Sequence, residues 1–304
     1  MPCGGGVALR WGTRNRSSAV AVLSGHSGGH SGGGSAPGSR PASVRSGEAA
    51  AIAEDVRELG GFGAETVIIP EVGDDLTARV DGLPDRFRAV LLVQIDPVLA
   101  RAASERAVED GLRLVVSDQD GAATALCAAV LLYLRTVGRS AAVAKVAVAG
   151  GEQLPSLVPL LMIAGVYDLL EWKDAHAAAF PWRQAVRDAD VVVDLRPGSV
   201  AAAETARIAQ DRPEGSVLRP ADAEWGHHVI AGVLRVAVAC PPGSMHVELD
   251  MLRVCAVSIV AAMPPPGHPR VTDAAITDAI EAAVRRSIDP RLATLGATDD
   301  TEVT

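Results

Sequence analysis

The chain is poor in several residue types on which common enzyme chemistries depend. Its 304 residues include two tyrosines and one asparagine, and aromatic residues make up 3% of the sequence. Of 28 basic residues only Lys145 and Lys173 are lysines. Neither lysine nor tyrosine occurs before Tyr133. A lysine base or a tyrosine acid therefore cannot come from the N-terminal part of the sequence.

Excess positive charge and long apolar runs are also absent. The net charge is −9, which provides no general attraction to nucleic acid or to anionic membranes. No apolar run reaches the roughly 18 residues that span a bilayer. The N-terminus (MPCGGGVALRWGTRNRSS) has arginines but lacks the apolar segment of a secretory signal. We therefore expect a cytoplasmic protein with neither a nucleic-acid nor a membrane partner.

Cysteines and histidines show no metal-binding spacing. Cys3, Cys127, Cys240 and Cys255 are scattered without a C-x-x-C pair, which favours buried thiols in a reducing compartment. His26 and His30 fall in a Gly/Ser-rich segment with no third ligand nearby, so we interpret them as loop residues.

The sequence that remains is typical of an α/β protein. Hydrophobic residues make up 48%, and the mean hydropathy is +0.22. From Glu48 onward, expected helices alternate with short apolar strands, and this alternation predicts parallel sheets with helices on both faces. Continuous apolar runs such as AVLLVQI are typical of buried parallel strands. We expect strands at 66–70, 89–95, 112–117, 145–150, 167–172, 190–195 and 216–219, and helices at 48–59, 97–110, 121–137, 181–188, 200–210, 227–240, 246–262 and 271–286, with a further helix ending at 163.

Length and pattern together predict two domains. The first is a smaller N-terminal α/β domain, and the second is a Rossmann-like doubly wound domain that ends in several helices. Four segments follow: a flexible N-terminus at 1–19, the first domain at 20–117 with a Gly/Ser-rich loop at 24–47, the second domain at 118–290, and a tail at 291–304.

A stretch within the second domain has the pattern of a dinucleotide-binding turn. VAVAGGEQLP (146–155) places a glycine pair where a strand meets a helix. The expected G-x-G-x-x-G is incomplete, because Glu152 and Pro155 stand at the second and third glycine positions. Glu152 brings negative charge toward a negative ligand, whereas Pro155 is acceptable in the first turn of a helix.

The chain resembles the malic enzyme family over most of residues 20–295. Ser117-Asp118-Gln119-Asp120-Gly121 is similar to the family's D-D-Q-H-G, and Val137-Gly138-Arg139 to its V-G-K turn. Matches of the same kind, in the family's order, occur at SGEAAAIAEDVREL, AGVYD, RDADVVVDLRPGSV, GVLR and IDPR.

This resemblance implies an NAD(P)-dependent, decarboxylating malate oxidoreductase, but the implied machinery is not retained. The family's acidic metal pair falls on Val93-Gln94, which leaves Asp118 as a vestigial third ligand. One carboxylate is a poor magnesium or manganese site. We therefore expect no divalent metal, and we expect Asp118 to act as a helix N-cap.

The proton-transfer and substrate positions differ from the family pattern in the same way. The family's lysine falls at Glu48, and no shift of the alignment recovers a lysine. Asparagines are missing from EWGHHVIAGVLR (224–235), and Arg219 replaces another. The resemblance would place a cofactor at Gly150, Gly151 and Glu152, with Asp174 at the ribose. We expect no cofactor, while NAD or NADP stays an open alternative.

Three functions follow from these observations. The favoured one is a degenerate homologue without malate-oxidising activity, acting as a homodimeric structural or regulatory partner for a protein or a small molecule. The second is an enzyme of altered chemistry on the same fold. It would require several polar groups to converge in the cleft between the two domains. The candidates are Asp118, Arg219, Glu224, His227, His228 and His246. The third is a malic-type oxidoreductase with substitute residues, and arginine would be a poor base in it.

Overall fold

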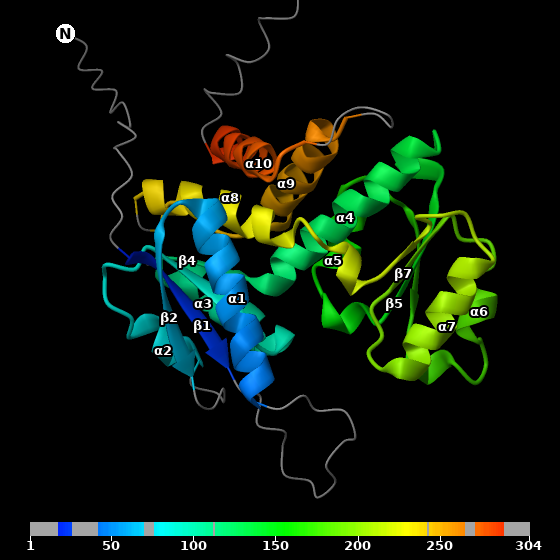
Figure 1. The fold of residues 1–304 in the computed structure, drawn as a ribbon, viewed down its shortest axis with the longest axis horizontal. Coiled ribbons are helices and arrows are strands. Elements are labelled where there is room, and N and C mark those ends of the chain that lie inside the picture. Colours follow the sequence, from blue (N-terminus) through cyan, green and yellow to red (C-terminus); the bar gives the residue numbers. More distant parts are fainter. Residues whose placement is uncertain are drawn as a thin grey trace, which may run out of the picture.

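Two four-stranded parallel sheets lie side by side, with α4 running between them (Figure 1). The computed structural model describes residues 18–25, 42–69, 76–111, 113–241, 243–264 and 271–288. The predicted α/β class is confirmed. Cys3, His26, His30 and the tail at 291–304 lie outside the described residues.

The first sheet has the order β2-β1-β3-β4. The all-apolar AVLLV sequence of β3 is fully buried, as a strand covered on both faces must be. The strand β1 was missed: its short Ala/Val run ends in Ser24 and Gly25, which we had assigned to the loop at 24–47. The same loop is shorter at its other end, where α1 already begins at Ala42. The strands are β1 Ser18–Gly25, β2 Gly63–Ile69, β3 Ala89–Val93 and β4 Leu114–Ser117.

Helices cover both faces of this sheet. Asp96 caps α3 by accepting from the amides of Val98 and Leu99, and Gly111 ends the helix in the left-handed conformation. A separate apolar cluster packs α2 and α3 against β3 through Val90, Leu92 and their neighbours. The helices of this half are α1 Ala42–Gly60, α2 Leu76–Asp81 and α3 Pro97–Asp110.

The second sheet has the order β6-β5-β7-β8, so successive strands are added on opposite sides of β5. This is the doubly wound arrangement that the sequence predicts. Its strands are β5 Lys145–Ala149, β6 Asp168–Trp172, β7 Val191–Asp194 and β8 Val217–Leu218. Its helices and 3-10 turns are η1 Ala141–Val143, η2 Gly151–Gln153, α5 Leu157–Ile163, η3 Asp174–His176, α6 Trp182–Ala185, α7 Ser199–Gln210 and η4 Pro220–Asp222.

Four long helices join the two halves: α4 Asp118–Thr136, α8 Gly226–Ala239, α9 Leu249–Ala262 and α10 Asp273–Ile288. The residues of α4 that face inward, such as Leu126 and Val130, are completely buried. Side chains of both sheets, including Leu91 and Val146, belong to the same apolar cluster as α4. The two sheets therefore share a core. No helix in the described ranges has the length and hydropathy to cross a membrane.

Candidate functional site

Ligands of doubly wound sheets bind at the carboxyl ends of strands, where the strand order reverses. In the first sheet the order reverses between β1 and β3, and in the second between β5 and β7. The two predicted sites lie at these ends: Asp118 follows β4 and stands beside Gln94, which follows β3, while Gly150 follows β5.

The N-cap of α4 is Ser117, which corrects the expectation that Asp118 has this role. The Ser117 hydroxyl accepts from the amide of Asp120, and the Asp120 carboxylate accepts from the Ser117 amide. With Asp118 as the N-cap, the third helical position would be Gly121, which has no side chain to complete such a reciprocal box. Asp118 is thereby left to face β3.

Asp118 contacts Gln94, the residue that follows β3. Its Oδ2 accepts from the Gln94 amide at 2.8 Å. Gln94 has φ +55°, the one positive value at a non-glycine among the described residues. Left-handed backbone at such a residue costs on the order of 1 kcal/mol or more, and it is enriched at functional sites. The strained Gln94 and Asp118 thus form one local unit.

The environment of Asp118 disfavours its charge. Oδ1 of this carboxylate is buried without a hydrogen-bond partner. Burial raises the pKa of Asp118 to about 6, although the Gln94 and Gln119 amides oppose the rise. Val93, at the position of the first acidic ligand in the resembled family, is 0% exposed and packs into the apolar core. Within the described ranges no three His, Cys, Asp or Glu residues are grouped as a metal site. The donors at this end of β3 do not fit magnesium or manganese.

The other polar residues proposed for this cleft have separate partners. Glu48 lies in α1, and its side chain is outside the described residues. His227, in α8, pairs with Asp55 of α1 at 3.1 Å. His228 points toward α10 instead, where its Nδ1 lies 3.0 Å from the hydroxyl of Thr277. The adjacent histidines therefore face different helices, as expected from their spacing.

Arg219, Glu224 and His246 do not add a common centre. Arg219 belongs to a turn in which its amide donates to Asp222, and its side chain is exposed. Glu224 is exposed, and His246 lies half-buried between α8 and α9. Arg219, His227 and His228 thus bond to separate partners, which weakens the hypothesis of altered chemistry.

The glycine turn after β5 is tightly packed. Gly150 has φ +71°, and a Cβ there would lie 2.9 Å from main-chain atoms of Leu195 and Arg196. Gly151 faces Glu171, whose Oε1 would lie 3.2 Å from an added Cβ. Glu152 is exposed. Gly150 is thus explained by its backbone conformation and by packing within the protein, whereas the Glu171 side chain that faces Gly151 is flexible and could move.

Pro155 has a different role from the one predicted. It precedes α5, which begins only at Leu157, and is not in the helix's first turn. A residue before proline is pushed out of the helical region, and Leu154 accordingly has φ −135° and ψ 75°. The chain therefore makes only a 3-10 turn after Gly150, and the helix N-terminus that would hold a pyrophosphate is displaced.

An arginine crosses the carboxyl ends of β6 and β7. The guanidinium of Arg196, which follows β7, lies 5.0 Å from the ring centre of Trp172 at the end of β6. It also lies 5.3 Å from the ring centre of Trp182. Its Nε and one terminal nitrogen donate to the Asp194 carboxylate at 2.9 and 2.7 Å.

Both oxygens of the Asp194 carboxylate accept hydrogen bonds. It is 3% exposed and also accepts from the indole of Trp182 and the hydroxyl of Thr205. This buried ion pair lies between the loop after β7 and Trp172 at the end of β6, at the carboxyl ends where a doubly wound sheet binds its ligand. Asp174, the predicted ribose acid, lies exposed in η3. The crevice does not fit NAD(P) as it stands.

The fold and these strand ends define a protein of two doubly wound parallel sheets, the second of Rossmann type. Solved structures that are similar to this chain include malic enzymes. The Thermotoga maritima NAD-dependent malic enzyme is 16% identical, with a TM-score of 0.69, covering 89% of this chain and 84% of that one. The Pyrococcus horikoshii malic enzyme is also 16% identical, with a TM-score of 0.66 and coverages of 90% and 77%.

A third example is the Entamoeba histolytica malic enzyme, 15% identical with a TM-score of 0.66, covering 94% of this chain and 71% of that one. Neither a protein-family model nor a curated protein matches the chain. At this identity the likeness establishes the fold, and at that level the resemblance stated from the sequence is confirmed.

Sequence reasoning missed the Asp194–Arg196 pair and its two tryptophans. The available signal was an acidic residue closing the apolar strand VVVD, followed two residues later by arginine. Tryptophan is scarce in the chain, with four residues in total. The pairing itself depends on the order of the strands, which places the ends of β6 and β7 on either side of β5.

Proposed function

We propose that this chain is a malic-enzyme-like protein without malate-oxidising activity that serves as a structural or regulatory partner. The observation that carries the proposal is the end of β3. Val93 is part of the apolar core, and Asp118 is bonded to the Gln94 amide. One carboxylate does not provide the several hard oxygens that magnesium or manganese requires.

The proton-transfer groups support the same conclusion. The first lysine of the chain is Lys145, and Glu48 stands where the resembled family has its lysine. Arginine is abundant, but its guanidinium holds its proton far above neutral pH, which makes it a poor base. No described cluster of histidines replaces it, because His227 and His228 bond to separate helices.

The proposal includes the absence of a bound dinucleotide. Arg196 occupies the crevice beside Trp172, and Glu152 adds a carboxylate to the turn that would face the phosphates. If NAD or NADP binds nonetheless, Gly150, Gly151 and Asp174 are the positions at which the resemblance places it.

A protein partner, most simply a second copy of the chain, completes the proposal. Met162, Ile163 and Tyr167 are 52%, 44% and 72% exposed near the end of α5, and they support a contact surface there. A cytoplasmic location is supported by Cys127 and Cys255, which are buried free thiols. Gel filtration with light scattering tests the homodimer.

The decisive experiment is an activity assay of the full chain. Reduction of NAD⁺ and of NADP⁺ is followed by absorbance with malate and Mn²⁺, beside the Thermotoga maritima enzyme as a positive control. We expect a rate equal to the blank without malate. Malate-dependent reduction that requires Mn²⁺ would overturn the proposal.

A further inference from the structure

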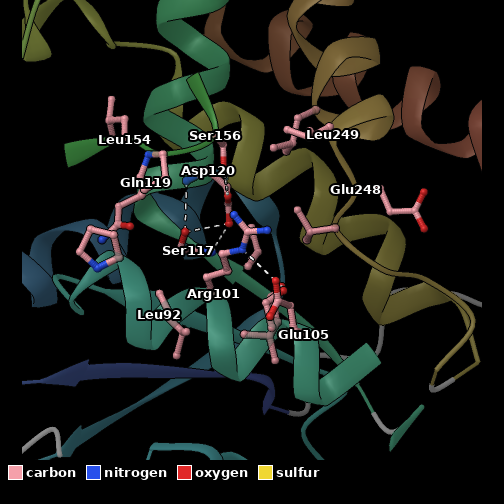
Figure 2. Close-up of a pocket in the computed structure, with 18 of the residues that line it drawn as sticks. Leu92, Arg101, Glu105, Ser117, Gln119, Asp120, Leu154, Ser156, Glu248 and Leu249 are labelled. Carbon is pink, nitrogen blue, oxygen red and sulfur yellow. Dashed lines mark hydrogen bonds and ion pairs between the residues drawn. The ribbon is translucent and has the colours of Figure 1, made fainter. Parts of the chain in front are cut away.

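A cavity of about 210 Å³ lies beside the start of α4 (Figure 2). It is enclosed by α3, β4, the start of α4, the turn before α5 and the start of α9. Liquid water occupies about 30 Å³ per molecule, so the volume suits a small molecule rather than a nucleotide. Asp118, whose carboxylate faces β3, does not line it.

The walls of the cavity are mainly apolar. Leu92 and Val116 contribute from the first sheet, and Leu154 from the turn after β5. Leu249 and Leu252 close the side formed by α9. These surfaces fit a short aliphatic group.

The deep polar group of the cavity is the Asp120 carboxylate (Figure 2). Its Oδ2 accepts from the amide and the hydroxyl of Ser117, at 3.0 and 2.7 Å. Its Oδ1 has a single long contact, 3.4 Å from the Ser156 hydroxyl. Oδ1 therefore keeps acceptor capacity for a donor inside the cavity.

No basic side chain in the described ranges forms an ion pair with Asp120. Arg101 is the one cation among the lining residues, and it bonds to Glu105 at 2.8 Å with 73% of its side chain exposed. Figure 2 shows this pair joined to each other rather than to Asp120. A buried carboxylate without a cationic partner favours a cationic ligand.

We propose that this cavity binds a small primary amine, with the ammonium group donating to Oδ1 of Asp120 and the aliphatic part lying against the apolar walls. Asp118, to which the resemblance assigns metal, and Gly150 and Gly151, to which it assigns cofactor, do not line this cavity. The proposal therefore stands whether or not the chain oxidises malate.

The test uses the full chain and n-butylamine as the probe, with sodium butyrate and 1-butanol as matched controls of the same chain length. The thermal-unfolding midpoint is measured against probe concentration at constant pH and ionic strength. We expect a saturable rise with butylamine, with a Kd of about millimolar, as for a ligand of few atoms. Butyrate or butanol binding as well as butylamine would overturn the proposal, as would a butylamine response that does not saturate.

Two variants locate the binding. Asp120→Asn removes the charge, and we expect affinity for butylamine to fall about tenfold or more. Because Asp120 also caps α4, a second variant avoids it: Ser104→Leu fills the cavity from α3. Ala102→Leu adds the same side chain on the exposed surface of that helix and serves as its control. Ser104→Leu should abolish the saturable response while Ala102→Leu retains it, and equal responses in both would refute the site.

Discussion

Replacing Asp118 by asparagine should stabilise this protein at neutral pH. The Asp118 carboxylate is buried, and its Oδ1 has no hydrogen-bond partner. Asparagine keeps an oxygen that can accept from the Gln94 amide at the position where Oδ2 lies 2.8 Å away. It removes the buried negative charge, which nothing in the described surroundings neutralises, and its NH2 group takes the place of the unpartnered Oδ1.

The pKa of Asp118 sets the magnitude and the sign of the expected change in the free energy of unfolding. Burial raises it to about 6 from 3.8, so the folded state binds a proton more tightly than the unfolded chain. This gap corresponds to ~3 kcal/mol, at about 1.4 kcal/mol per pH unit. The wild type is therefore most favoured below pH 3.8 and loses this stability as the pH rises through about 6. Asp118→Asn should be ~3 kcal/mol more stable at pH 7.5, and the difference should vanish toward pH 4.

Urea unfolding of both proteins from pH 4 to pH 8 measures this difference. A variant that is less stable at pH 7.5, or a difference that does not change with pH, would refute the reasoning. Repeating the pH 7.5 series with excess Mn²⁺ adds a second criterion. A metal-dependent rise in the stability of the wild type that Asp118→Asn abolishes would show that the carboxylate binds metal. That result would contradict the conclusion that the donors at the end of β3 do not suit magnesium or manganese.

Four other substitutions, one of them a control, test the remaining contacts by urea unfolding at pH 7. Arg196→Met leaves the Asp194 carboxylate buried without its charge partner and should destabilise by ~3–5 kcal/mol, whereas a loss below 1 kcal/mol would contradict a compensated ion pair. Gly150→Ala and Gly138→Ala both force a side chain onto positive φ, at about 1 kcal/mol each, but only Gly150 has main-chain atoms 2.9 Å from the new Cβ. The Gly150 variant should therefore be less stable than the Gly138 variant, and equal losses would contradict the packing. Ser117→Ala removes the N-cap of α4 and should cost ~1 kcal/mol; no loss would mean that the cap is not formed in solution.

Much of the fold follows from local patterns in the sequence. The apolar runs that became β3, β5 and β7 lie between helical segments, and alternation of this kind has few solutions other than parallel sheets. The strand β1 escaped prediction because Ser18–Gly25 runs into a Gly/Ser-rich segment that reads as a loop. Its central place in the first sheet is a property of the strand order, which local composition does not encode.

The sequence predicted where the residues of the candidate sites lie along the fold, but it did not predict which residues they contact. Asp118 was located at a helix start, yet its role depended on whether Ser117 or Asp118 capped α4. That choice was decided by Asp120, which completes the capping box with Ser117. Likewise, Gly150 marked a tight turn, but the sequence could not show that Arg196 lies against it. Contacts between the ends of different strands depend on tertiary structure.

The two sets of strand ends differ in a way that bears on function. In the second sheet, the residues around the cofactor turn stabilise each other: Asp194 and Arg196 form a buried pair, and the turn packs on the loop after β7. In the first sheet, Gln94 retains a left-handed backbone and Asp118 an unpartnered oxygen, and both are unfavourable in the folded state. Unfavourable local features of this kind are retained where function opposes stability. The end of β3 is therefore the place where the gain in stability of Asp118→Asn should be compared with any loss of binding.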